Sequence, residues 1–168
     1  QCRLPSRQMI SKPSVGQAVN LSGTPYDRGV QQARIDPKSG PAVFSAIMNR
    51  VEQARSALAD ASDFLAAQWA FTAAHALGQL EQIHGIADGF GIEVNDLFAY
   101  LHLGVIEDGE GLPSTEEDGC SVLACDTRAD GPLLAKNRDY RGEHRALQRV
   151  FLENDPSWGA RSVLSVGS

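Results

Sequence analysis

Residues 116–140 read EEDGCSVLACDTRADGPLLAKNRDY and hold the clearest change of pattern in the chain. Two short apolar runs, 121–126 and 132–137, are separated by a polar segment that ends in Asp130 and Gly131. Short runs rich in valine and leucine favour strands, and Asp-Gly is a typical bend between paired strands. The stretch therefore predicts a β-hairpin.

A cysteine stands where an acidic loop gives way to this hairpin. Residues 107–119 are acidic and rich in Gly, Pro and Ser, which is typical of an exposed, cleavage-prone connector. Gly119 permits backbone conformations closed to other residues, so the Cys120 thiol could approach the carbonyl that precedes it. Attack there would give a thioester, and hydrolysis would leave Cys120 as a new N-terminus. Its α-amine, with an ordinary pKa near ~8, could act as general base for its own thiol. A Gly-Cys pair by itself fits a buried structural cysteine better.

Upstream of this loop, residues 1–106 are predicted to form a helical region. Thr24 is the expected N-cap of its first helix, with Pro25 at the first helical position. Asp27 would lie at the positive end of that helix dipole. These signals place the start of the helix at Pro25.

Three further helical segments are expected, at 40–60, 62–91 and 94–108, the last with Asn95 as its cap. Each of the first two segments shows one apolar face. In 40–60 this face holds Val43, Ile47, Val51, Ala54 and Leu58. In 62–91 it holds Leu65, Trp69, Ala73, Leu77, Leu80 and His84.

Downstream of the hairpin the pattern again favours strands, at 146–154 and 161–168. Residues 120–168 are thus the expected start of a β-sheet core, and 1–168 a single α+β domain. Four strands with helices only upstream would leave one face of the sheet uncovered. We therefore expect an incomplete domain that a missing C-terminal half or a partner chain completes.

Composition excludes several classes of function. The net charge of −6 disfavours nucleic acid or an anionic membrane as the main partner. No apolar run reaches the ~18 residues of a membrane-spanning helix. The N-terminus lacks the apolar centre of a secretory signal. A cytoplasmic location is the expectation, and a signal already removed would leave a secreted or periplasmic location open.

Cysteine and histidine usage argues against disulfides and metal. The only cysteines are Cys2, Cys120 and Cys125, a sparse and odd set that is typical of a reducing compartment. No CxxC pair, HExxH motif or zinc-like spacing is present in the sequence. We expect neither a metal nor an organic cofactor.

Three segments together resemble the acyl-CoA:isopenicillin N acyltransferase-like family, a group of cysteine N-terminal nucleophile hydrolases. DGCS at 118–121, leading into the hairpin, is similar to the family's nucleophile strand and NxD motif. LSGTPYDRGVQQA at 21–33 is similar to its glycine-rich N-terminal segment, and 81–108 to the helix-turn-helix before the nucleophile. The three cover most of residues 19–140 in the family's order.

The resemblance implies an αββα sandwich, self-cleavage between residues 119 and 120, and a set of site residues. Cys120 matches the nucleophile, and Asp139 the carboxylate that orients the freed α-amine. Asn137 matches the asparagine of the motif. Lys136 stands where related bile salt hydrolases carry arginine, so thiolate stabilisation is a candidate role for it. Ser121 is a further candidate for support of the site.

The expected activity is hydrolysis or transfer of an acyl group held on a small amide or on an acyl-CoA-like thioester, through a Cys120 acyl-enzyme. The chain alone is expected to be inactive, and a homo-oligomer is one open possibility. One rival is a catalytically silent fragment or assembly partner in which Cys120 is structural. A second rival is a cysteine–histidine hydrolase that is not cleaved, with His144 as the local histidine.

Overall fold

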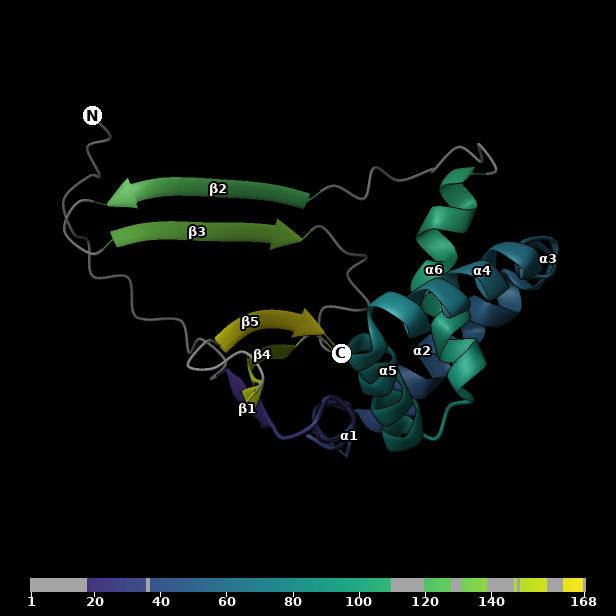
Figure 1. The fold of residues 1–168 in the computed structure, drawn as a ribbon, viewed down its shortest axis with the longest axis horizontal. Helices are drawn as coiled ribbons and strands as arrows, with labels where there is room; N and C mark the ends of the chain where they lie inside the picture. Colours follow the sequence, from purple (N-terminus) through teal and green to yellow (C-terminus); the bar gives the residue numbers. More distant parts are fainter. Residues whose placement is uncertain are drawn as a thin grey trace.

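The computed structural model describes residues 18–35, 37–109, 120–127, 131–138, 147, 149–156 and 162–167. The helices are α1 (Pro25–Arg34), α2 (Gly40–Gln53), α3 (Arg55–Asp60), α4 (Ser62–His75), α5 (Leu77–Phe90) and α6 (Val94–Gly109). The strands are β1 (Val19–Ser22), β2 (Cys120–Thr127), β3 (Gly131–Arg138), β4 (Arg149–Asn154) and β5 (Ser162–Gly167). Helices lie on one side and strands on the other, an α+β arrangement (Figure 1).

The first helix begins as its sequence predicts. Thr24 is the N-cap and Pro25 opens α1. The Asp27 N–H donates to the Thr24 hydroxyl, and Asp27 Oδ2 accepts from the Thr24 N–H at 3.1 Å, so the capping box is closed in both directions. The Thr24 hydroxyl also donates to Asp27 Oδ2, at 2.6 Å. This hydrogen bond, together with the one from the Thr24 N–H, holds the pKa of Asp27 below its ordinary value.

Helices α1 and α5 pack with their backbones in contact. A Cβ placed on Gly29 would lie 2.2 Å from the Gln82 carbonyl oxygen, and one on Gly85 would lie 2.1 Å from that of Tyr26. Real side chains do not approach backbone so closely, so only glycine is compatible with this contact. The pairing fixes α1 on α5 and thereby places β1, which leads into α1.

Two of the predicted helical segments are each broken in the middle. Segment 40–60 is interrupted at Ala54, and segment 62–91 at Ala76, where φ is −145° and ψ is 46°. The predicted single apolar face across 62–91 is therefore wrong. Leu77 is 57% exposed while Leu80 is buried, because the break turns α5 relative to α4. Gly91, with φ of 71°, ends α5 as a left-handed C-cap.

Helix α6 is longer than predicted at its C-terminal end and begins one residue earlier than its proposed cap. Its first hydrogen bonds are donated to the Glu93 carbonyl, so Asn95 lies within the helix and is not its N-cap. The helix continues to Gly109, so the first residues of the predicted 107–119 loop are helical. An ion pair between Glu107 and Arg50 of α2, with Oε2 and Nη2 2.7 Å apart, ties this last turn to the bundle.

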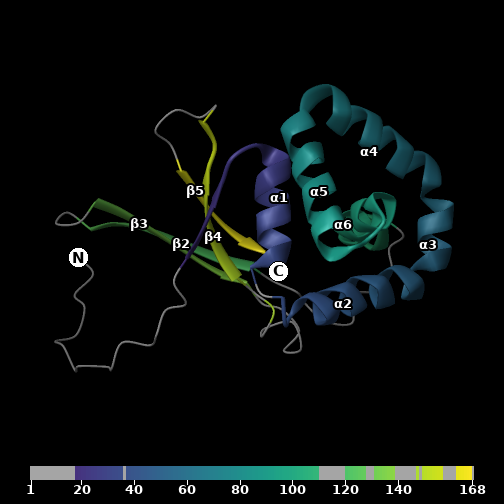
Figure 2. The ribbon, with the colours of Figure 1, turned by 90° about the horizontal axis from the view of Figure 1, so that it is seen from below.

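The helical core surrounds α6. Seen along α6, helices α2, α3, α4 and α5 form an arc around it (Figure 2). The buried cluster at its centre consists of Val43, Ile47, Ala87, Ile92 and Leu97. In the described part of the chain, no helix is both long and apolar enough to cross a bilayer.

The described strands form two sheets, and one strand was not predicted. β2 and β3 pair antiparallel from Cys120 opposite Arg138 to Thr127 opposite Gly131, which confirms the hairpin. The second sheet has the order β1-β4-β5, with β1 parallel to β4 and β5 antiparallel to it. The four-residue β1 was missed, although it holds Leu21, which is fully buried.

Candidate functional site

The sequence-predicted site lies at the open end of the β2–β3 hairpin. Cys120 is the first residue of β2 and lies opposite Arg138, the last residue of β3. Ser121 lies opposite Asn137 in the next position of the register, and Lys136 follows one position further along. The pairing thus brings four of the predicted site residues together at one end of the ladder: Cys120, Ser121, Lys136 and Asn137.

The other residues of the predicted site are not described. Gly119 and Asp139 lie outside the described residues, as does His144 of the rival hydrolase. In the sequence, Asp139 directly follows Arg138, the residue paired with Cys120. Directly opposite residues in an antiparallel pair have Cα atoms about 4.5–5.5 Å apart. The start of β2 and the end of β3 are therefore near neighbours through their backbones.

A second site is centred on a buried arginine that the sequence analysis did not single out. Arg28 of α1 is 2% exposed. Its Nη2 lies 2.8 Å from Oδ2 of Asp155, and its Nε lies 3.7 Å from Oε2 of Glu153. Its Nη1 donates to the Gly23 carbonyl at 2.9 Å. One guanidinium thus holds two carboxylates at the end of β4 and the turn between β1 and α1.

Further polar contacts join the same parts of the chain. The Gln82 side chain of α5 donates to Oε2 of Glu153 at 3.3 Å. Arg149 of β4 donates to the hydroxyl of Ser39, just before α2, at 3.4 Å. Together with β1–β4 pairing, these contacts fasten the region after Cys120 to the helical region before it.

Arg28 could hardly have been found from sequence. It lies in GTPYDRG, where an arginine after an N-cap reads as an ordinary helix-surface residue. Its partners, Glu153 and Asp155, lie more than a hundred residues away. A buried ion pair is retained only where its geometry and hydrogen bonds offset desolvation. The cluster is therefore best understood as a device that fixes the position of β4.

The outer face of α1 makes two further polar contacts. The Tyr26 hydroxyl donates to Oδ2 of Asp88 on α5 at 2.7 Å, and this hydrogen bond raises the pKa of Tyr26. The Gln31 amide exchanges two hydrogen bonds with the backbone of Ser22, at 2.6 and 3.1 Å. The first contact joins α1 to α5, and the second ties the end of β1 to α1.

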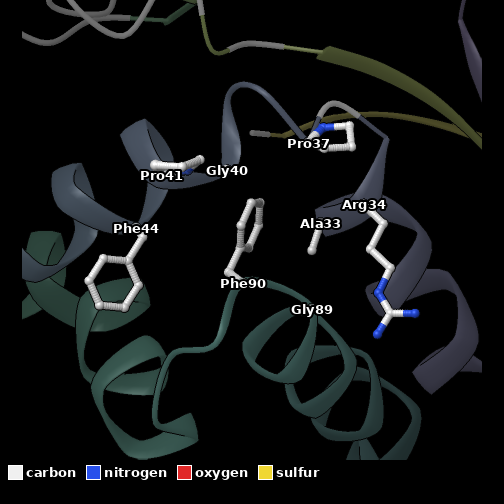
Figure 3. A pocket seen from close by; sticks show the side chains of 8 residues that line it. All are labelled: Ala33, Arg34, Pro37, Gly40, Pro41, Phe44, Gly89 and Phe90. Atoms are coloured by element: carbon white, nitrogen blue, oxygen red, sulfur yellow. The ribbon is translucent and has the colours of Figure 1, made fainter.

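Two pockets of about 360 Å³ each lie beside this face. The first, which we call the Phe90 pocket, is lined by Ala33, Arg34, Pro37, Gly40, Pro41, Phe44, Gly89 and Phe90 (Figure 3). The second is lined by Ser22, Tyr26, Asp27, Val30, Gln31 and Arg34. The described lining of both comes from β1, α1, α2, α5 and the turn before α2. Neither pocket has a described lining residue from the β2–β3 hairpin.

Histidines of the helical region pack against aromatic rings. His84 meets Trp69 edge-on, with ring centroids 5.7 Å apart, and the His102 ring lies 4.3 Å from that of Phe98. Nδ1 of His102 donates to the Phe98 carbonyl at 2.8 Å. Within the described ranges, no group of three His, Cys, Asp or Glu side chains is placed to hold a metal ion.

The chain matches no family model, and no curated protein matches it either.

Proposed function

We propose that the protein is a self-processing cysteine amidohydrolase or acyltransferase of the N-terminal nucleophile type. The β2–β3 register is the observation that supports it most. It sets Cys120 at the start of β2 against Arg138 at the end of β3, immediately before Asp139 in the chain. The proposed reaction uses a carboxylate close to the free amine of Cys120, and this order of residues makes Asp139 the candidate.

The first step is maturation. The Cys120 Sγ attacks the Gly119 carbonyl carbon, the peptide C–N bond breaks, and the departing Cys120 nitrogen takes up the thiol proton. Water then hydrolyses the resulting thioester between Gly119 and Cys120 Sγ, releasing a carboxylate at Gly119. Cys120 is left with both a free thiol and a free α-amine.

The second step is acyl transfer. The α-amine accepts the thiol proton, and the thiolate attacks the acyl carbon of the substrate. The α-ammonium returns the proton to the leaving amine or thiol as its bond to the acyl carbon breaks. Water or an acceptor amine then loses a proton to the α-amine and attacks the Cys120 thioester. The C–S bond breaks, the thiolate leaves and takes the proton back from the α-ammonium, and the product is an acid or a new amide.

The neighbouring residues are assigned supporting roles. Asp139 orients the α-amine and favours its protonated form. Asn137 supports the end of the hairpin, opposite Ser121 in the register. Lys136, by its charge, favours the thiolate over the thiol. No metal or organic cofactor enters the reaction as proposed.

The proposal also includes the layer arrangement of the complete domain. In an αββα sandwich, α1–α6 would supply one helical layer and the two sheets would belong to the central layers. A C-terminal extension or a partner chain would complete the pocket for a small acylated amide or acyl-CoA-like substrate. We place the protein in the reducing cytoplasm because its cysteines are few and odd in number.

Intact mass under denaturing conditions tests the proposal. The wild type should give two pieces that meet between Gly119 and Cys120, both in the 168-residue chain and in any longer gene product that contains it. Cys120→Ala should remain whole, and the control Cys125→Ala should be cut like the wild type. An uncut wild type in both lengths would contradict the proposal and favour the catalytically silent assembly partner.

A further inference from the structure

The Phe90 pocket is a hollow where the ends of α1 and α5 meet the start of α2. In Figure 3 the Phe90 ring lies in its middle, with Phe44 on the α2 side and Ala33 and Arg34 on the α1 side. The pocket is thus built from two consecutive helices, α1 and α2, and from α5, which is distant from both in the sequence.

Most of the described lining is apolar, and close packing of α1 on α5 fixes its shape. Phe44 is 38% exposed and Phe90 is half-buried, so both rings offer accessible apolar surface. Gly89 packs so closely on Ala33 that an added Cβ would lie 2.4 Å from the Ala33 Cβ. This contact fixes α1 on α5 at the floor of the pocket. Gly40, in contrast, borders open space.

One residue of the described lining is charged, Arg34 in the last turn of α1, and in Figure 3 its side chain lies on the other side of the Phe90 ring from Phe44. None of the ion pairs found among the described residues involves Arg34. Asp88, the acidic neighbour of Gly89 in the sequence, accepts a hydrogen bond from the Tyr26 hydroxyl. The pocket therefore combines two aromatic rings with one cation and no described carboxylate in its lining.

We propose that the Phe90 pocket binds a small carboxylate with an aromatic or branched-alkyl body. The body would lie against Phe44 and Phe90, and the carboxylate would pair with Arg34, whose planar fork suits it. A volume of about 360 Å³ is at the small end of ligand pockets, which excludes a whole acyl-CoA. The site is separate from the Cys120 chemistry, and Cys120→Ala should leave binding unchanged.

The test is a titration of the whole chain with 3-phenylpropanoate as the probe. Backbone amide NMR shifts are recorded at each ligand concentration. The neutral 3-phenylpropanamide, which has the same body, serves as the matched ligand. We expect saturable shifts at the amides of Ala33, Gly40 and Gly89 and a dissociation constant in the low millimolar range, as suits a small ligand. The carboxylate should bind about three- to fivefold more tightly than the amide, which is the range of an exposed ion pair.

Four variants test separately how much the Arg34 charge and the aromatic rings contribute to binding. Arg34→Gln should remove the preference for the carboxylate, and Arg34→Lys should keep part of it. Phe44→Ala should weaken both ligands. Phe71→Ala is its control, since Phe71 is 61% exposed on α4 and does not line the pocket. Equal binding of the two ligands to the wild type, shifts that do not saturate, or equal effects of Phe44→Ala and Phe71→Ala would each overturn the proposal.

Discussion

Replacing the buried guanidinium of Arg28 should destabilise the protein strongly. Arg28→Ala removes the guanidinium that pairs with the side chains of Asp155 and Glu153, which are only 11% and 12% exposed. Loss of one partner from a buried ion pair costs about 3–5 kcal/mol. Because both carboxylates keep some exposure and Glu153 retains Gln82, we expect the lower end of that range, about 3 kcal/mol. That is a large part of the 5–15 kcal/mol that stabilises a typical domain.

Urea unfolding followed by circular dichroism measures this loss, and two comparisons make it specific. Arg55→Ala removes an arginine that pairs with Glu52 on the surface, where the Arg55 side chain is 77% exposed, and should change little. A double-mutant cycle of Arg28→Ala with Asp155→Ala should show a coupling of about 1–3 kcal/mol. If Arg28→Ala is no more destabilising than Arg55→Ala, or if the cycle shows no coupling, the ion cluster does not hold β4 in place.

Three further substitutions, two of them with a control, test the helix packing, the sheet core and the N-terminal cap of α1. Gly85→Ala should lower the melting temperature sharply, because its methyl group would meet the α1 backbone; Gly104→Ala, whose methyl group meets only open space, should raise it slightly. Phe151→Ala should cost about 3–5 kcal/mol in urea unfolding, since Phe151 is 1% exposed, whereas Val150→Ala at a 37% exposed position should be nearly neutral. The pKa of Asp27 is lower in the folded chain, so its stabilising effect is complete above the unfolded pKa of about 4 and is lost as the pH falls through the folded value. Asp27→Asn should therefore make the free energy of unfolding depend less on pH in this acidic range.

Local signals predicted the elements whose ends are marked by particular residues. The hydroxyl of Thr24 and the ring of Pro25 specify where α1 begins, and they do so without help from distant contacts. The two short apolar runs on either side of the Asp130-Gly131 bend likewise predicted the β2–β3 pairing. The register that places Cys120 opposite Arg138 follows from those two strands and the length of the turn.

Features set by distant partners could not be predicted. The break falls at Ala76, two residues before Gly78, although alanine itself favours helix. β1 is only four residues long and pairs with β4, more than a hundred residues later. Arg28 is buried because carboxylates from the end of β4 reach it, which no pattern within residues 21–33 indicates. In each case tertiary packing decides the outcome.

The proposed chemistry is tested most directly at the α-amine of Cys120. A fluorescent thioester reacts with an N-terminal cysteine to form an amide, whereas an internal cysteine gives only a thioester that hydroxylamine removes. After hydroxylamine treatment, the account predicts a stable label on a piece whose sequence begins at Cys120, and none in Cys120→Ala. A wild-type protein that keeps no label at Cys120, with the chain intact across Gly119, would contradict it.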